Sequence, residues 1–215
     1  HERLVGSEMC IRDRIWPVER RWVDPEYVRD GTELAIAEML HGGVTCFADM
    51  HLWPEVVART AAELHMRCSV GLVVVDAPTR WASRTDEYIE KGLALRDEYR
   101  GDPLVSTFLA PHAPYTVCGP QLEQIAELAH SERLPVMMHA AESEAEDLFV
   151  REACGPFAEG LAKRSIEWKA PRVSTIQYLK QVGILAARPL LAHCIRVDDA
   201  DIENLRSTGA KVAHC

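Results

Sequence analysis

The sequence predicts an α/β fold with parallel strands, and three observations support this prediction. Six short apolar runs alternate with segments of helical periodicity along the 215 residues. The runs are almost continuous in Val, Leu, Met and Ala, which is typical of parallel strands covered by helices. Histidines and acidic residues follow directly after several of these runs. Two architectures have these properties, an open doubly wound sheet and a (β/α)8 barrel.

The beginning of the chain differs from the remainder. Residues 1–14 show neither helical nor strand periodicity, and their segment LVGSEMCIRDR resembles a translated sequencing adapter. We therefore expect 1–14 to be a non-native or disordered leader, and 15–215 to form one domain.

Each apolar run has the length of a single strand and is bounded by turn residues or a helical segment. The predicted strands are 44–50, 68–75, 104–110, 135–140, 189–194 and 210–214. A TIM-type barrel has eight strands in about 250 residues, so six strands predict an incomplete barrel. Neither G-x-G-x-x-G nor G-x-x-x-x-G-K-[ST] follows any of the runs, so the sequence gives no support for nucleotide-phosphate binding of either usual kind.

Helical periodicity and capping residues indicate the helices between the strands. Asp24 is a suitable N-cap, and Pro25 suits the first helical position. Val28, Ala35 and Met39 should form the buried face of the helix that begins there. The predicted helices are 25–40, 54–66, 86–99, 120–130, 156–162, 174–182 and 199–206.

Composition restricts the kinds of partner. The net charge is −9 and the isoelectric point is near 5.5, without a basic cluster, which argues against nucleic-acid binding. No apolar run approaches the roughly 20 residues of a membrane helix. The seven cysteines are scattered and odd in number, which fits reduced thiols in the cytoplasm. A small-molecule substrate, with no nucleic acid and no membrane, is therefore the expected partner.

Histidines recur at the ends of the predicted strands. Five of the nine histidines do so, namely His51, His112, His139, His193 and His214. Active sites of parallel barrels lie at the carboxyl ends of the strands. One such histidine is readily explained as a polar residue at a strand exit, whereas five at one edge favour a site.

The segment PVMMHAAESEAE at 135–146 places His139 near the end of a strand and Glu142 three residues later. This pair suits hydrolysis at a metal, because neutral imidazole binds the ion and a carboxylate moves protons to and from water. The alternative is a core histidine beside an exposed acidic helix start that contains Glu142, Glu144 and Glu146.

Four motifs together resemble the amidohydrolase superfamily, with the nearest similarity to its nucleoside-deaminase branch. They are HAAE at 139–142, AHC at 192–194, PHAPYT at 111–116 and IWPVE at 15–19. The resemblance implies a (β/α)8 barrel in which the predicted strands are strands two to seven. That family also uses an H-x-H after strand one and an aspartate after strand eight. No H-x-H occurs in this sequence and no eighth strand is found, so we expect a fragment.

The resemblance also implies roles for five residues. His139 would bind the catalytic metal, and His193 would be a second metal contact that orients and polarises the attacking water. Glu142 would contact the substrate and carry protons between the water and the ring nitrogen. His112 would contact the purine, and Glu19 would hold the ribose hydroxyls.

The activity implied is metal-dependent hydrolytic deamination of an aminated purine nucleoside, of the methylthioadenosine/S-adenosylhomocysteine type. The metal would be a divalent ion, zinc or iron. Three alternatives stay open: hydrolysis of another amino- or halo-substituted heterocycle, hydrolysis of aminodeoxyfutalosine, and a catalytically inactive fragment. Homo-oligomerisation is left open as well.

Overall fold

The computed structural model describes residues 14–215, so the predicted leader lies outside the described residues except for Arg14. The strands are β1 (Cys46–Asp49), β2 (Arg67–Val74), β3 (Val105–Pro111), β4 (Met137–Ala140), β5 (Leu190–His193) and β6 (Lys211–Ala213). The α-helices are α2 (Trp16–Trp22), α3 (Pro25–His41), α4 (Pro54–Glu63), α5 (Thr85–Glu98), α6 (Gly119–Glu132), α7 (Glu144–Glu152), α8 (Gly155–Lys163), α9 (Thr175–Gln181) and α10 (Asp199–Thr208). A 3-10 helix, η2, spans Ile184–Ala187.

All the pairings between these strands are parallel, as the composition of the apolar runs predicts. One sheet has the order β1-β2-β3 and the other has the order β4-β5-β6. Backbone hydrogen bonds connect β3 with the start of the next run, because Leu109 N donates to Pro135 O at 2.8 Å. The strands therefore follow one another in chain order, without the reversal that a doubly wound sheet requires.

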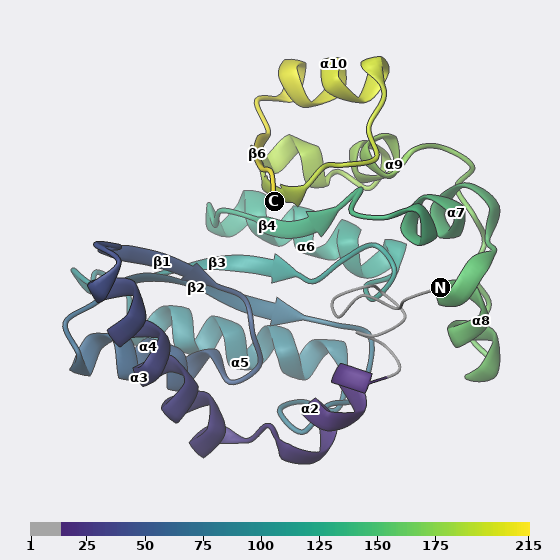
Figure 1. The fold of residues 1–215 in the computed structure, drawn as a ribbon. Helices are drawn as coiled ribbons and strands as arrows, with labels where there is room; N and C mark the ends of the chain where they lie inside the picture. The colour runs from purple at the N-terminus through teal and green to yellow at the C-terminus, as the bar shows by residue number, and fades with distance from the viewer. Residues whose placement is uncertain (1–13) are drawn as a thin grey trace.

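Helices pack against the strands and bury their apolar side chains. Figure 1 shows α4 and α5 along one side of β1–β3, while α9 and α10 lie beyond β4–β6. Leu72 on β2, Leu109 on β3 and Met138 on β4 are almost completely buried, and so are Leu122 and Ile125 on α6. This helix-covered arrangement explains why the strands read as continuous apolar runs.

The α3 helix begins where the capping residues predict, but part of its predicted buried face is wrong. The Asp24 side chain accepts a hydrogen bond from Tyr27 N at 2.9 Å. Val28 is buried as expected, whereas Ala35 is exposed and Ile36, which is 1% exposed, takes the inward position. Packing against α4 sets this face, and the bulkier Ile36 fills the contact better than a methyl group does.

Two short helices lie outside the predicted set. The α2 helix begins at Trp16 without a side-chain cap, so it has no clear start signal. The α7 helix begins after Ser143, whose side chain accepts a hydrogen bond from Glu146 N at 3.2 Å. Its acidic first turn agrees with the alternative interpretation of 142–146 as a helix start.

Among residues 14–215, no helix combines the length and the apolar character that a membrane crossing requires.

Candidate active site

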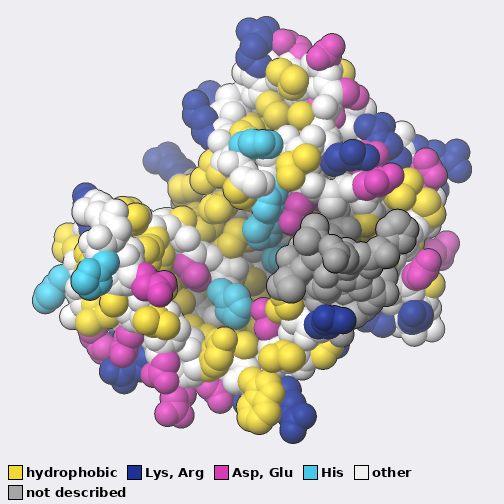
Figure 2. Space-filling view, viewed as in Figure 1, with side chains coloured by type: hydrophobic (Ala, Val, Ile, Leu, Met, Phe, Trp, Pro, Cys, Tyr) yellow, Lys and Arg dark blue, Asp and Glu magenta, His cyan; other side chains and the backbone are white. Residues whose placement is uncertain are grey.

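Three histidines from neighbouring strands lie together at the carboxyl edge of the sheets. His139 belongs to β4 and His193 is the last residue of β5, and His139 Nδ1 lies 3.0 Å from His193 Nε2. The ring of His112, directly after β3, has its centroid 5.1 Å from that of His139. Figure 2 shows histidine side chains in the hollow between the two halves of the molecule. The order of the parallel strands produces this cluster from residues far apart in sequence.

The turns after β4 and β5 adopt unusual backbone conformations. Ala141, His193 and Cys194 have φ values of 52°, 76° and 50°. Positive φ is uncommon outside glycine, and it persists where surrounding contacts determine the conformation. One such contact is the hydrogen bond from Cys194 N to Ala140 O at 3.0 Å. The two turns are thus connected through their backbones.

Glu142 lies on the side of the turn that faces the histidines. Its Oε1 is 3.7 Å from His193 Nε2, and its Oε2 accepts a hydrogen bond from Tyr115 Oη at 3.4 Å. The side chain is 27% exposed, so one part of the carboxylate faces the protein and another part reaches solvent. This geometry suits a carboxylate that exchanges protons with a molecule held near His193.

Hydrogen bonds determine the tautomer of His112. Its Nδ1 lies 2.8 Å from Thr116 Oγ1, and that hydroxyl donates to Ala113 O at 3.2 Å. Because the hydroxyl proton is used there, Nδ1 carries the imidazole proton and Nε2 remains an acceptor. Burial lowers the pKa of His112 to about 3, with smaller contributions in the same direction from His139 and His51. His112 is therefore a neutral imidazole near pH 7.

His139 is also favoured in the neutral form. Burial and the neighbouring His193 lower the pKa of His139, and Glu142 acts in the opposite direction. Neutral imidazole is the form that binds a metal. Within residues 14–215, however, no three His, Cys, Asp or Glu side chains are arranged to hold an ion together. The two imidazoles fit part of a catalytic zinc site, which usually has three protein ligands.

A second polar group lies at the end of β1. Glu19 on α2 has its Oε1 3.9 Å from His51 Nε2, and His51 N donates to Asp49 Oδ1 at 3.1 Å. The interaction with Glu19 raises the pKa of His51, whereas burial raises the pKa of Asp49. The sequence predicts a role for Glu19 and places His51 among the histidines at the strand ends, but it assigns no role to His51 or Asp49. Asp49 is the last residue of β1 and His51 follows it by two positions, so their place at the carboxyl end of a strand is the available signal.

A cavity of about 670 Å³ connects these groups. Glu19, His51, His112 and His139 contribute polar atoms to its wall. The cavity is large enough for a nucleoside-sized ligand, because small-molecule sites usually occupy about 300 to 1,000 Å³. Glu19, His112 and His139 thus line one cavity. Glu142 and His193 are not lining residues, but His193 contacts His139 and Glu142 contacts Tyr115, which both line it.

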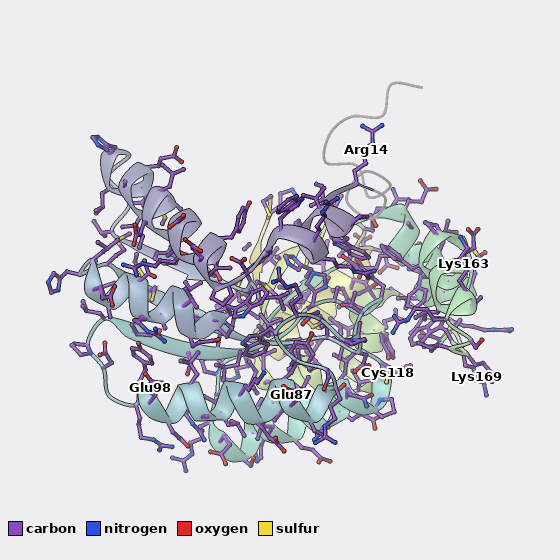
Figure 3. The ribbon with its side chains drawn as sticks, turned by 90° about the horizontal axis from the view of Figure 1, so that it is seen from below. Arg14, Glu87, Glu98, Cys118, Lys163 and Lys169 are labelled. Carbon is purple, nitrogen blue, oxygen red and sulfur yellow. The ribbon has the colours of Figure 1, made fainter. Side chains whose placement is uncertain are left out.

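Aromatic side chains form the apolar part of this wall. Phe157 on α8 stacks on Tyr115 with ring centroids 4.0 Å apart, and Phe149 stacks on Trp168 at 4.4 Å. Both Phe157 and Trp168 line the cavity, so the segment between α7 and α9 is part of the site wall. Figure 3 shows Lys163 and Lys169 at the outer margin of this segment, away from the strands.

The parallel fold and the histidine-carboxylate group at the strand ends are typical of hydrolytic α/β enzymes. The sequence model of the amidohydrolase family matches residues 3–215, and the chain belongs to this family.

Relatives and solved structures agree with that assignment. The chain is 38% identical over 205 residues to a 5-methylthioadenosine/S-adenosylhomocysteine deaminase of Saccharophagus degradans, covering 95% of this chain and 42% of the relative. A protein of the same name from Teredinibacter turnerae is 39% identical, with 97% and 43% covered. An adenosine deaminase from Xanthomonas campestris, crystallised with zinc, superimposes with a TM-score of 0.82 at 35% identity, covering 96% of this chain and 43% of that chain. The chain thus spans less than half the length of these proteins.

Proposed function

We propose that this chain forms the central part of a metal-dependent deaminase that acts on aminated purine nucleosides of the methylthioadenosine/S-adenosylhomocysteine type. The observation that carries the proposal is the close approach of His139, His193 and Glu142, with 3.0 Å between the imidazole nitrogens and 3.7 Å from His193 to the carboxylate. The names of the relatives support this substrate class. A small-molecule substrate also agrees with the size of the cavity, about 670 Å³, and with the negative net charge.

The barrel belongs to the same proposal. We infer that β1 to β6 correspond to strands two to seven of an eight-stranded barrel, because they are parallel and follow chain order. The remaining barrel strands would supply the metal ligands that residues 14–215 do not provide. We also infer that the protein acts in the cytoplasm, because its cysteines are scattered and the six within residues 14–215 are free thiols.

In this mechanism, His139 and His193 would hold the metal in their neutral form. A bound divalent ion, zinc by the precedent of the Xanthomonas structure, makes water nucleophilic at neutral pH. Glu142 would accept one proton from the attacking water and deliver it to the ring nitrogen. It would then carry the second proton of that water, from the new hydroxyl group on the ring carbon, to the amino group that leaves as ammonia. His193 would orient the water, since its Nε2 lies 3.7 Å from the Glu142 carboxylate and 3.0 Å from His139 Nδ1.

The remaining residues bind the substrate. His112 is a neutral acceptor at Nε2, and it would receive a hydrogen bond from the purine at the wall of the cavity. Glu19 would accept hydrogen bonds from both ribose hydroxyls, which a carboxylate does in bidentate fashion. The Glu19 carboxylate lies at the cavity wall, where its Oε1 is 3.9 Å from His51 Nε2. In this proposal the purine would lie towards β3 and the sugar towards α2.

The test uses a completed chain, which we define as residues 15–215 joined to the segments that flank the matching region in the Saccharophagus degradans relative. Glu142→Gln should lower kcat for methylthioadenosine by at least about a thousandfold while zinc content is unchanged, because it removes a proton carrier. His139→Ala should remove both zinc and activity. The matched control is Glu144→Gln, which removes an exposed carboxylate from the same segment and should have no effect.

Ammonia release and zinc content are measured together for these variants. Near-normal kcat in Glu142→Gln would refute the role of this residue. Turnover restricted to a halogenated heterocycle or to aminodeoxyfutalosine would refute the nucleoside proposal and favour an alternative substrate of the same family.

A further inference from the structure

One buried acidic side chain has no part in the mechanism above. Glu146 lies in the first turn of α7 and is completely buried, although it belongs to an acidic run that resembles an exposed helix start. A buried carboxylate is unfavourable unless hydrogen bonds compensate it. Its surroundings therefore require an explanation.

Both oxygens of Glu146 accept hydrogen bonds from the backbone of one turn. Ala141 N donates to Oε1 at 2.8 Å, and Glu142 N donates to Oε2 at 2.9 Å. The carboxylate thus binds two consecutive amide groups, and the second belongs to the proposed proton carrier.

The same turn is attached to the loop that follows β5. The carbonyl of Ala141 accepts hydrogen bonds from Ile195 N and Arg196 N, both at 2.8 Å. Ala141 has φ of 52°, a conformation that a non-glycine residue keeps only when its surroundings hold it. Glu146 on one side and the 195–196 amides on the other supply these contacts. The turn bearing Glu142 and the loop that follows His193 are therefore fixed relative to each other.

We propose that Glu146 is a positioning residue that holds the Ala141–Glu142 turn so that the Glu142 carboxylate faces His193. Its relevance to catalysis rests on the proposed function, in which Glu142 carries the proton. The structural part of the proposal depends only on the contacts of this chain. A displacement of Glu142 by 1 Å is enough to reduce catalysis strongly, because proton transfer requires hydrogen-bond distance.

Glu146→Gln is the informative substitution. A glutamine carboxamide has one acceptor oxygen and one donor NH2 group, so it can accept from only one of the two amides and directs a donor at the other. Glu146→Asp is the milder variant, because it retains both acceptor oxygens and introduces no donor. Its side chain is shorter, however, and cannot reach both amides. Glu144→Gln is the matched control, since it removes a carboxylate from the same helical turn at an exposed position.

The first measurement is amide hydrogen exchange by NMR on the 215-residue chain. We expect the Ala141 and Glu142 amides to exchange about tenfold faster in Glu146→Gln, because each loses or weakens one hydrogen bond. The Met138 amide, in the middle of β4, should keep its rate, and Glu144→Gln should resemble the wild type throughout. If Glu146→Gln does not fold, the same comparison is made with Glu146→Asp. Unchanged exchange at both amides in the folded variant would overturn the proposal.

The second measurement is steady-state kinetics in the completed chain. Glu146→Gln should reduce kcat by about ten- to a hundredfold with little change in KM, and Glu146→Asp should recover part of the loss. Faster exchange with unchanged kcat would overturn the positioning role. If the unmodified completed chain has no deaminase activity, the proposed function fails, whereas the exchange result still decides whether Glu146 holds the turn.

Discussion

At the scale of single residues, burial determines the protonation of His112. Its pKa of about 3 lies well below the ordinary value of 6.5, because burial disfavours the imidazolium ion. Between these two values the unfolded chain binds a proton that the folded chain does not bind. The free energy of unfolding should therefore decrease as the pH falls from 6.5 towards 3, by up to about 1.4 kcal/mol per pH unit from this residue.

The measurement is urea unfolding of the wild type and of His112→Asn at several pH values in this window. The asparagine can still donate to Thr116 Oγ1 but does not titrate. Other groups contribute to the pH dependence of both proteins, so the difference between their slopes isolates His112. Equal slopes would show that folding leaves the pKa of His112 unchanged, contrary to this prediction.

A site residue can be predicted from the sequence when its position at the end of a parallel strand is enough to place it in the site. His112, His139 and His193 could be located in the sequence because parallel strands bring their carboxyl ends to one edge. Glu146 could not, because an acid at a helix start is usually exposed and nothing local indicates burial. The approach of His51 to Glu19 depends on the packing of α2, a helix that has no capping signal.

At the scale of elements, close contact between strands requires a glycine in β2. A Cβ atom on Gly71 would lie 2.9 Å from Ala110 Cβ and 3.0 Å from both Asp49 O and Met50 Cβ. These atoms belong to the neighbouring strand β3 and to the end of β1, so they cannot move independently. Gly71→Ala should lower the free energy of unfolding by about 1 to 3 kcal/mol, as expected for overpacking.

Gly31 on α3 provides the matched control. A Cβ atom there has nothing within 4 Å, and the residue lies in the interior of a helix. Gly31→Ala should therefore raise the free energy of unfolding by about 0.5 to 1 kcal/mol. Both variants are compared by urea unfolding. Equal effects of the two substitutions would contradict the contact argument for Gly71.

The elements with strong periodic signals could be predicted from the sequence, and those fixed by tertiary contacts could not. The run at 189–194 is recognised as a strand because it is apolar and short, and β5 occupies Leu190–His193 within it. The α7 helix has only nine residues, and its first turn carries the acids that suggested an exposed segment. Its burial follows from contacts of Phe149 and Val150 with the core, which no local pattern shows.

At the scale of the whole molecule, the described sheets have open edges. Of the described strands, β1 is paired only with β2, and β6 is paired only with β5. Val212 on β6 is 44% exposed, and Val44 before β1 is 41% exposed. Unpaired edges with apolar side chains favour the addition of further strands. This agrees with the proposal that additional strands continue the barrel on both sides.

The composition of the site leads to the last prediction, for the 215-residue chain expressed alone. His139 and His193 supply two imidazoles, and residues 14–215 contain no third ligand arranged with them. Zinc affinity falls steeply when ligands are lost, so this chain should bind zinc weakly and should release no ammonia from methylthioadenosine, S-adenosylhomocysteine or adenosine. The completed chain should gain both tight zinc binding and turnover. Metal analysis and ammonia assays on the two proteins, prepared in parallel, provide the test. Stoichiometric zinc and turnover in the 215-residue chain would mean that its metal ligands lie elsewhere than His139 and His193.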